Sequence, residues 1–208
     1  MQSLVNFFNN GGPVMYIILF VFAIGLSILI ERTIFLFRCR INSNVFMQDI
    51  LSFLQAGKVS EATDFCKDHT APLPLIIGAG ITRSSHGEKE LKEAVDEVAI
   101  NEIPKLLKRT HYLQLIANVA TLLGLLGTIF GLMQSFVSVG SVDPSQKAAL
   151  LASGISTAMN TTAFGLMVAI PFMVGHAYLN STTQDIIHDI DRSATRLVSF
   201  FSRKNDED

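Results

Sequence analysis

Charged side chains are missing from three long stretches of this chain, and the gaps decide its fold. No Asp, Glu, Lys or Arg occurs in residues 1–30, 110–142 or 148–184. A helix needs about 20 apolar residues to cross the hydrocarbon core of a bilayer. The pattern therefore predicts an all-α integral membrane protein, with transmembrane helices over 13–37, 113–139 and 148–179.

The second and third segments are longer than a bilayer requires. At 1.5 Å per residue, residues 113–139 span roughly 40 Å and residues 148–179 roughly 48 Å. Both therefore exceed a hydrocarbon thickness of about 30 Å. We expect both helices to extend into the cytoplasm.

A cleaved signal peptide is the alternative interpretation of the first segment. Such a peptide has a basic start and a small-residue cleavage site. Residues 1–12 carry no Lys or Arg, and Glu31 and Arg32 follow the apolar run directly. The sequence favours a retained helix, and the apolar side chains within 1–12 suggest a short segment at the membrane interface.

The basic residues near the helix ends predict the orientation. Lys and Arg are concentrated at one end of each helix, and they are absent from 1–12 and represented only by Lys147 in 140–147. Basic residues favour the cytoplasmic side. We expect a multi-pass protein with 1–12 and the 140–147 loop on the periplasmic side. The 38–112 segment and the 180–208 tail then lie in the cytoplasm.

The segment 38–112 holds 10 basic and 10 acidic side chains, so it resembles a soluble helical region. Asn42 and Ser43 are suitable N-caps for a helix that Gly57 ends. A second short helix is expected over 60–68. Pro72 and Pro74 are expected to break the chain.

Two further helices are predicted in the same segment. The first runs over 75–84. The second begins after Gly87 and continues toward the second span, with a kink at Pro104.

Small residues form two rows on the second span. Gly127, Gly131 and Ser135 form one row at four-residue spacing, and a second row holds Ala120, Gly124 and Thr128. Such rows let helix backbones approach closely in lipid. We expect tight packing on more than one side, and we expect Gly127→Leu or Gly131→Leu to disrupt oligomer assembly without preventing insertion.

The third span is unusually polar in one half. Its polar side chains are Ser153, Ser156, Thr157, Asn160, Thr161 and Thr162. Hydroxyl groups can donate to their own helix carbonyls. For six polar side chains, a wetted or interhelical face is the favoured interpretation. Pro171 is expected to kink this helix.

A mildly polar face also follows the second span. It contains Asn118, Thr121, Leu125, Thr128, Leu132 and Ser135. The short 140–147 connection predicts that the two long helices are antiparallel neighbours. Glu31 and Arg32 stand near the end of the first span, and no other Asp, Glu, Lys or Arg lies within a span, so a proton path would need a titrating group from a partner.

Several classes of chemistry have no support in the sequence. The chain has no GxxxxGK[ST] nucleotide loop, no metal-ligand spacing among its histidines and no clustered basic surface for nucleic acid. An intramembrane enzyme would need a base or nucleophile deep in a span. We expect no catalytic residue, no cofactor and no metal, and Cys39 and Cys66 suggest reduced thiols.

Two motifs resemble the MotA/TolQ/ExbB proton-channel family. They are Thr121-Leu-Leu-Gly-Leu-Leu-Gly-Thr-Ile-Phe-Gly-Leu-Met-Gln-Ser-Phe136 and Thr162-Ala-Phe-Gly-Leu-Met-Val-Ala-Ile-Pro171. The three-span layout and Glu31-Arg32 at the inner end of the first span are also similar, and the chain looks closest to ExbB and TolQ.

The resemblance implies a homopentamer in the bacterial inner membrane. Two single-span ExbD-like or TolR-like subunits would occupy its pore, and their membrane Asp would carry the proton. A TonB-like or TolA-like protein is a further implied partner. Thr128 and Thr162 match the pore-lining threonines of the family. Thr157 stands where ExbB-type proteins often carry a Glu.

We therefore expect the ring-forming subunit of a proton-driven motor that energises TonB-dependent outer-membrane transport. A TolQ-like role in envelope integrity and a non-conducting membrane scaffold are the alternatives. The expected proton-pathway residues are Thr128, Thr162, Thr157, Asn160, Asn118 and Thr121. The expected helix-packing residues are Gly124, Gly127, Gly131 and Gly165.

Overall fold

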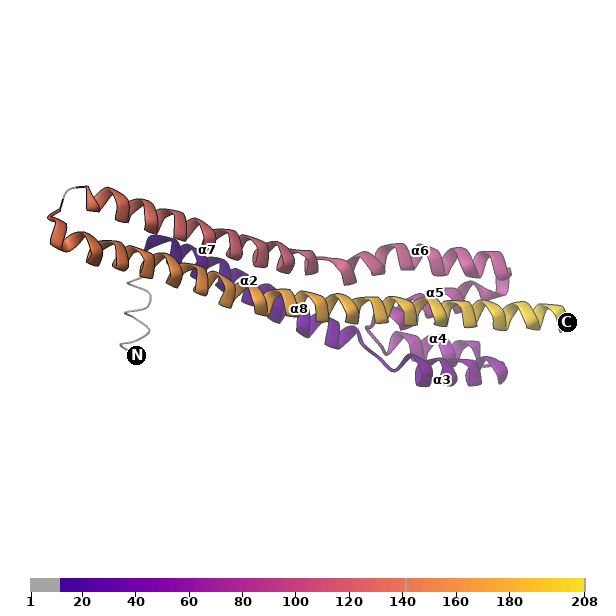
Figure 1. Cartoon of the computed structure of the whole chain (residues 1–208). Helices are drawn as coiled ribbons and strands as arrows, with labels where there is room; N and C mark the ends of the chain where they lie inside the picture. The colour runs from indigo at the N-terminus through magenta and orange to yellow at the C-terminus, as the bar shows by residue number, and fades with distance from the viewer. Residues whose placement is uncertain (1–11, 141, 208) are drawn as a thin grey trace. The chain divides into compact units, whose positions relative to one another are not determined.

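The computed structural model describes residues 12–140 and 142–207, and within these ranges it is helical with no strand (Figure 1). The elements are α2 Pro13–Cys39, α3 Ser43–Gln55, α4 Val59–Lys67, α5 Pro72–Arg83, η1 Ser84–His86, α6 Glu88–Leu107, α7 Thr110–Val139 and α8 Pro144–Glu207. The all-α prediction is confirmed. The expected interfacial segment, apart from Gly12, lies outside the described residues.

Three of the described helices are long and apolar enough to cross a membrane, and they contain the three predicted spans. The chain divides into two compact units. The first, which we call the hairpin unit, comprises Met1–Glu31 and Arg109–Tyr178. The second, the bundle unit, comprises Arg32–Lys108 and Leu179–Asp208.

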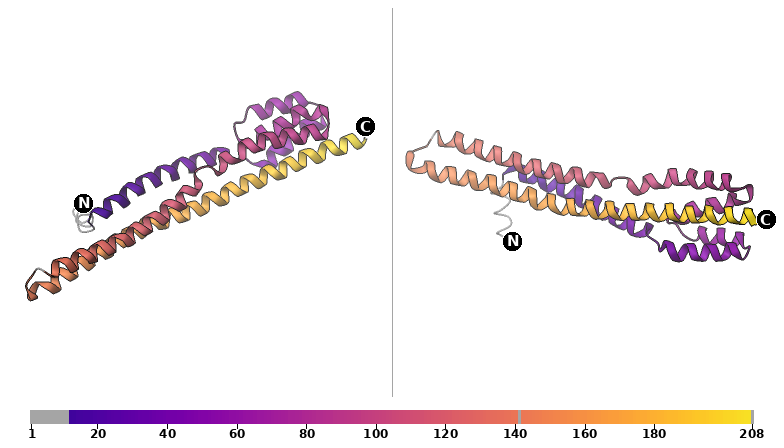
Figure 2. Two further views of the ribbon diagram at one scale, coloured as in Figure 1. Left: turned by 90° about the horizontal axis from the view of Figure 1, so that it is seen from above. Right: turned by 45° about the vertical axis from the view of Figure 1, so that its right-hand side comes forward.

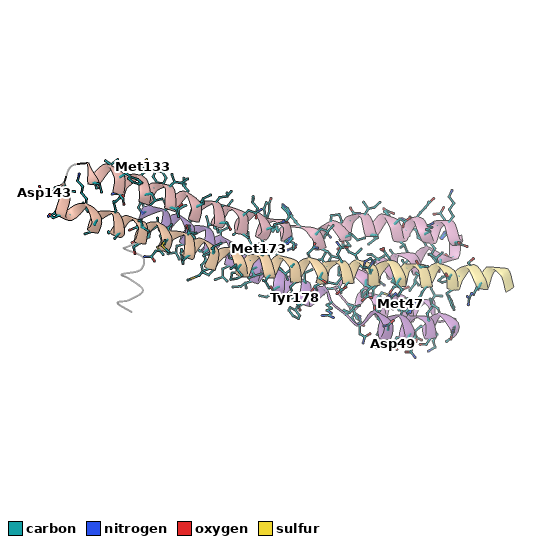
Figure 3. All side chains as sticks on the ribbon, in the orientation of Figure 1. Met47, Asp49, Met133, Asp143, Met173 and Tyr178 are labelled. Atoms are coloured by element: carbon teal, nitrogen blue, oxygen red, sulfur yellow. The ribbon has the colours of Figure 1, made fainter. Side chains whose placement is uncertain are left out.

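In the hairpin unit, α7 and the first part of α8 lie side by side in antiparallel directions in each view (Figures 1 and 2). Asp143 lies at the turn between them (Figure 3). The predicted connection, 140–147, is too long, because α8 begins at Pro144. Proline suits a first helical position, where its fixed φ is helical and its missing N–H would have no partner.

The two helices meet through backbone atoms rather than large side chains. A Cβ added at Gly124 would lie 3.3 Å from the Cα atoms of Gly165 and Thr162, and one at Gly165 would lie 2.9 Å from Gly124 Cα. A Cβ at Gly127 would overlap the Thr161 side chain. These residues define the α7–α8 seam.

The expectation that the two small-residue rows pack on different sides is wrong for the glycines. Gly124 and Gly127 come from different rows, yet both face α8 of the same chain, as does Gly131 against Ala158. A straight seam follows alternating three- and four-residue steps, because a helix has 3.6 residues per turn. Leucine at these glycines would therefore separate two helices within one chain, not only neighbouring chains.

The helix α2 packs against this hairpin near its other end. Phe22 and Phe172 have ring centroids 5.8 Å apart. Gly25 lies against Phe172 and Ile116, and a Cβ at Gly175 would lie 2.8 Å from a methyl group of Leu29. Helix α2 therefore packs against the side of α8 that carries Gly175.

The bundle unit has a side-chain core of a different kind. Its fully buried apolar residues include Ile50, Ile76, Leu91 and Leu197. Close packing reaches Gly80, where an added Cβ would lie 2.7 Å from Val95 and 3.0 Å from Leu197. The amphipathic helices of the soluble-looking segment bury these side chains together.

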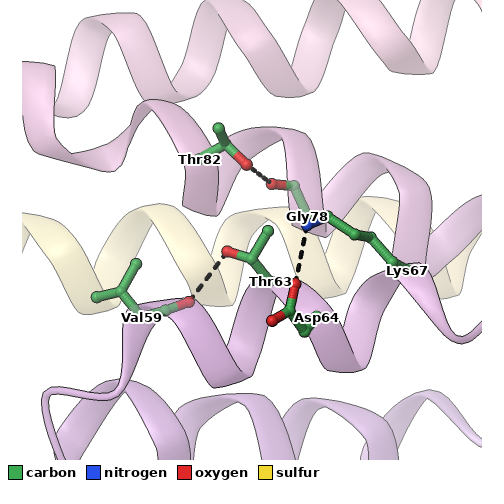
Figure 4. A network of polar contacts seen from close by, with 6 residues as sticks. All are labelled: Val59, Thr63, Asp64, Lys67, Gly78 and Thr82. Atoms are coloured by element: carbon green, nitrogen blue, oxygen red, sulfur yellow. Dashed lines mark hydrogen bonds and ion pairs between the residues drawn. The ribbon is translucent and has the colours of Figure 1, made fainter.

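Helix α3 confirms the capping predictions at both of its ends. The side-chain oxygen of Asn42 accepts a hydrogen bond from Val45 N at 3.3 Å. Gly57 has φ +73°, which a residue with a side chain rarely adopts. In α4 and α5, Thr63 and Thr82 donate to carbonyls four residues back, at 3.0 and 2.8 Å (Figure 4).

The prolines were expected to break the chain before a helix over 75–84, and that expectation is wrong. Helix α5 begins at Pro72 and includes Pro74. The first N–H groups of a helix have no partner within the helix. Two prolines in the first turn therefore remove no hydrogen bond and instead define the helix start.

The long helix expected from Gly87 toward the second span is present as α6, and it is separate from the helix that contains the span. Helix α6 ends at Leu107, Lys108 has ψ 136°, and Arg109 has a left-handed φ of +66°. Pro104 cannot donate to Ile100, which weakens the last turns. Arg32, which is 3% exposed, donates from Nη2 to Lys105 O at 3.0 Å. The guanidinium thus donates to a carbonyl oxygen that has no hydrogen-bond donor within the interrupted helix.

Helix α8 is 64 residues long and continues beyond Leu179, the predicted end of the third span, so the expected helical extension of that span is present. Pro171 lies inside it, and the bend expected there stays a prediction. The third span and its extension thus form one continuous helix, α8. The helix that precedes the second span, α6, is separate from α7.

Candidate functional site

The polar side chains of the hairpin are the candidate site, and Thr162 makes the contact that organises them. Its hydroxyl donates to the carbonyl oxygen of Gly124 at 3.0 Å, so it joins α8 to α7. The glycine seam brings the two backbones close enough for a side chain as short as threonine to reach across.

Thr128 lies on the same side of the hairpin as Thr162. Thr128 follows the seam residue Gly127, and Thr162 follows the seam residue Thr161. Each is therefore turned by about 100° from the seam. In an antiparallel pair, the same rotation from the seam carries both side chains to one side. Both are partly exposed in the chain.

Asn118 and Thr121 extend this side along α7. Thr121 is about 20°, and Asn118 about 80°, around the helix from Thr128. Both are exposed. We call Asn118, Thr121, Thr128 and Thr162 the threonine side of the hairpin.

Thr157 and Asn160 point elsewhere. They lie about 140° and 160° around α8 from Thr162. Thr157 lines a cavity with residues of α7 that are not on the threonine side, among them Gln134 and Ser138. The six expected proton-pathway residues therefore occupy two sides of the hairpin rather than one.

The threonine side faces away from α2. Gly175, which contacts Leu29 of α2, lies about 140° around α8 from Thr162. Apolar residues such as Leu125 and Leu166 flank the threonines and are exposed in the chain. A polar strip on an apolar surface needs water or another polypeptide beside it in a membrane.

The hydroxyl protons at this site already have acceptors. Thr128 donates to Leu125 O at 2.6 Å and Thr121 to Ala117 O at 3.0 Å, in addition to the bond from Thr162. A hydroxyl has one proton and two lone pairs. In this geometry the three hydroxyl oxygens can only accept further hydrogen bonds. Thr121 and Thr128 donate to carbonyl oxygens of their own helix, which is the interpretation favoured less above.

Among the described residues of the hairpin unit, acidic and basic side chains lie only near its ends. Arg109 and Glu31 form an ion pair at 3.0 Å, and both are about half exposed. Among the described residues, no group of three or more His, Cys, Asp or Glu side chains is placed to hold a metal ion. The site offers neutral oxygen atoms and no acid or base.

Two features escaped the sequence analysis. The α8 half of the seam includes Ala158 and Thr161, and Thr161 is completely buried. The second is Arg32, whose guanidinium also lies 4.8 Å from the Phe35 ring centre. The Glu31-Arg32 pair at the end of the apolar run, together with Pro104, was the available signal.

Known proteins are similar to this chain over most of its length. A family model described as the MotA/TolQ/ExbB proton channel family matches residues 68–192, more than half of the chain. An ExbB-like biopolymer transport protein of Synechocystis is 30% identical over 149 residues, covering 71% of this chain and 70% of its own.

Two further relatives cover more of the chain. An ExbB homolog of Methanothermobacter thermautotrophicus is 27% identical over 191 residues, which are 91% of this chain and 67% of the relative. The biopolymer transport protein ExbB of Neisseria gonorrhoeae is 26% identical over 208 residues, covering 90% and 91%.

Proposed function

Because the chain belongs to the MotA/TolQ/ExbB proton channel family, we propose that it is the ring-forming subunit of a proton-driven motor in the bacterial inner membrane. Proteins of this family are channel or transport subunits and not enzymes. The chain is a multi-pass membrane protein with an ExbB-like role. Beyond this, we propose the ring assembly, the partner proteins and the process that the motor drives.

The ring is most simply a homopentamer whose pore is lined by the threonine side. The observation that carries this proposal is the position of Thr128 and Thr162 on one side of the hairpin, turned away from α2. That side is polar, partly exposed and uncharged. A pore surface has these properties, whereas a lipid-facing surface does not.

The titrating group comes from a second protein in this proposal. The second and third spans hold no acidic side chain, and Glu31 lies near the end of the first span in an ion pair with Arg109, so two single-span ExbD-like or TolR-like subunits in the pore supply the carboxyl group. A protonated carboxyl can donate to Thr128 or Thr162, whose lone pairs are available. The ionised carboxylate needs a donor, so a threonine hydroxyl must then leave its backbone carbonyl.

The proposed topology puts 1–12 and the turn before Pro144 in the periplasm. The spans are 13–37, 113–139 and 148–179, and the segments 38–112 and 180–208 lie in the cytoplasm. The distribution of Lys and Arg supports this orientation.

The output that we propose is movement of a TonB-like partner for outer-membrane transport. The relatives carry the name biopolymer transport protein ExbB, which supports this branch. A TolQ-like role in envelope integrity uses the same hairpin and is distinguished by the partner that copurifies.

Proton flux in liposomes tests the proposal. The chain is reconstituted with an ExbD-like or TolR-like single-span subunit from the same organism, and proton entry is followed with a pH-sensitive dye. We expect flux only when both proteins are present, and strong loss of flux in Thr162→Val with the ring intact.

Thr161→Val is the matched control, since it removes a hydroxyl that donates to Thr157 O within the same helix, 3.0 Å away. Assembly without any proton flux would instead identify a membrane scaffold. Equal loss of flux in both variants would show that the threonine side does not line the pore.

A further inference from the structure

A cavity of about 660 Å³ lies between α3 and the C-terminal part of α8, within the bundle unit. Its volume falls in the range of about 300–1,000 Å³ that is typical of small-molecule sites. Such sites are lined largely by apolar side chains, with a few polar groups that fix the ligand. The proposed motor function gives this cavity no role, and its lining indicates the ligand that would fit.

The apolar part of the lining comes from both helices. Leu51 and Leu54 lie about one turn apart on α3, and Phe200 lines the cavity from α8. Leu54 is almost completely buried, whereas Leu51 and Phe200 are half-buried. Their remaining exposed surface can cover the apolar body of a ligand, and its removal from water would favour binding.

The charged part of the lining is only basic. Arg196, Ser199 and Arg203 follow three- and four-residue steps, so they share one face of α8. Both arginines are exposed, and no lining residue is acidic. Neither guanidinium forms an ion pair with a side chain in residues 12–140 or 142–203. The cavity therefore holds two positive charges without a negative charge in its lining.

A hydrogen bond orients one of the two guanidiniums. Arg196 Nη1 donates to the side-chain oxygen of Asn44 at 3.3 Å, which links α8 to the first turn of α3. A guanidinium has five N–H groups, so others stay available to a ligand. The planar arrangement of these donors suits the oxygen atoms of a phosphate or a carboxylate.

We propose that this cavity binds a small amphiphilic anion. Its phosphate or carboxylate group would lie between Arg196 and Arg203, and its apolar body would lie against the leucines of α3. A cation would find two like charges and no acidic partner there. The site does not depend on the proposed motor function, because it needs only the folded bundle unit.

The ligand is a soluble molecule rather than a lipid of the bilayer. In the proposed topology the third span ends at Leu179, and Arg196 lies roughly 25 Å further along α8 at 1.5 Å per residue. The headgroup layer adds only about 5–8 Å to each side of the hydrocarbon core. A lipid that stays in the bilayer therefore does not reach the arginines, whereas a monomeric anion in the cytoplasm does.

Binding of 1-naphthyl phosphate tests the proposal. This probe joins an apolar ring to an anionic phosphate and dissolves in water. The full chain is reconstituted in nanodiscs of phosphatidylcholine, and binding is measured by isothermal titration calorimetry with empty nanodiscs as the blank. We expect one site per chain with a Kd of about 0.5 mM, the affinity that an ordinary ligand efficiency gives a probe of this size.

Removing either positive charge from the cavity should weaken binding. Arg203→Gln and Arg196→Gln should each raise the Kd about tenfold, because the phosphate loses charge-assisted hydrogen bonds. Arg192→Gln is the matched control, since it removes an exposed arginine about one turn earlier on α8 that does not line this cavity. It should leave the Kd unchanged. Arg203→Lys keeps the charge and should change the Kd less than Arg203→Gln.

Three further measurements separate the parts and the source of the ligand. 1-Naphthol keeps the ring without the charge, and inorganic phosphate keeps the charge without the ring. Each should bind at least about tenfold more weakly than 1-naphthyl phosphate. Replacing part of the phosphatidylcholine with anionic phosphatidylglycerol should leave the Kd of 1-naphthyl phosphate unchanged, because the bilayer lipid does not reach the cavity.

Three results would overturn the proposal. No binding above the empty-nanodisc blank would show that the cavity is closed to small anions, as it would be if another copy of the chain covered it. Equal weakening in Arg192→Gln and Arg203→Gln would show a response to net charge alone. Loss of binding in phosphatidylglycerol nanodiscs would identify a bilayer lipid as the occupant.

Discussion

The helices of the hairpin unit and those of the bundle unit pack in opposite ways. In the hairpin, Gly124, Gly127 and Gly165 place two backbones in direct contact, with almost no large side chain between them. In the bundle, the space between helices is filled by side chains such as Ile76 and Leu91.

The surroundings of each unit explain the difference. In water, burying an apolar side chain stabilises a fold by about 25 cal/mol per Å². In lipid this term is absent, so the hairpin relies on van der Waals contact and interhelical hydrogen bonds, which require short distances. Most leucines and both phenylalanines of α7 are accordingly on its outside, among them Leu122, Leu126 and Phe136.

The largest expected effect follows from breaking the backbone contact of the hairpin. Gly127→Leu should prevent the folded protomer from forming, because a side chain at this position overlaps Thr161 and cannot be accommodated without separating the helices. Membrane insertion should persist. The measurement is the yield of monodisperse protein and of the ring by native mass spectrometry.

Ala152→Leu is the control for added bulk on the hairpin, since Ala152 is exposed on α8. It should assemble normally. A Gly127→Leu protein that still formed stable monomers with native helix content would show that the seam is not needed within the chain.

The next largest effect concerns the bundle. Ile76→Ala should lower the free energy of unfolding by about 2–5 kcal/mol, because it leaves a cavity in a fully buried core. Val45→Ala, at a site 54% exposed, should change it little. Thermal unfolding followed by circular dichroism compares the two variants, and similar melting temperatures would contradict the division into two packing types.

The sequence predicted the type of each region better than its contacts. Missing charges identify the spans because a charged group in lipid is costly, and this signal needs no knowledge of neighbours. The Asn42 cap and the Gly57 turn are equally local. The contacts of Gly127 were assigned to other copies of the chain, since a row of small residues does not say which helix lies against it.

The candidate site shows the same limit. Periodicity placed Asn118, Thr121 and Thr128 on one face of α7, and the helix carries them there. Periodicity separates Thr157 and Thr162 by about 140° around α8, but it could not say which helix lies beside each of them until the seam was known. The break at Arg109 also depends on Arg32, which is 73 residues from Lys105 in sequence.

A polar contact near the C-terminal end of α2 has an intermediate expected effect. Arg32→Met should cost about 1–3 kcal/mol, because the Lys105 carbonyl loses its donor in a buried position. Arg109→Met removes an exposed ion pair with Glu31 and should cost less than about 1 kcal/mol. The unfolding midpoints of the two purified variants test the order, and a larger loss in Arg109→Met would reverse it.

The smallest expected effect separates two kinds of hydrogen bond in the hairpin. Thr162 donates across the seam to Gly124, whereas Thr128 donates to Leu125 within its own helix. Valine keeps the shape of threonine and removes the hydroxyl. Interhelical hydrogen bonds in membrane proteins contribute about 0.6–2 kcal/mol.

Thr162→Val should therefore lower the melting temperature of the assembled protein slightly, and Thr128→Val should lower it less, because the α7 backbone keeps its own hydrogen bonds. Differential scanning calorimetry of both variants in the same detergent makes the comparison. If Thr128→Val destabilised the protein as much as Thr162→Val, the bond across the seam would have no stabilising role of its own.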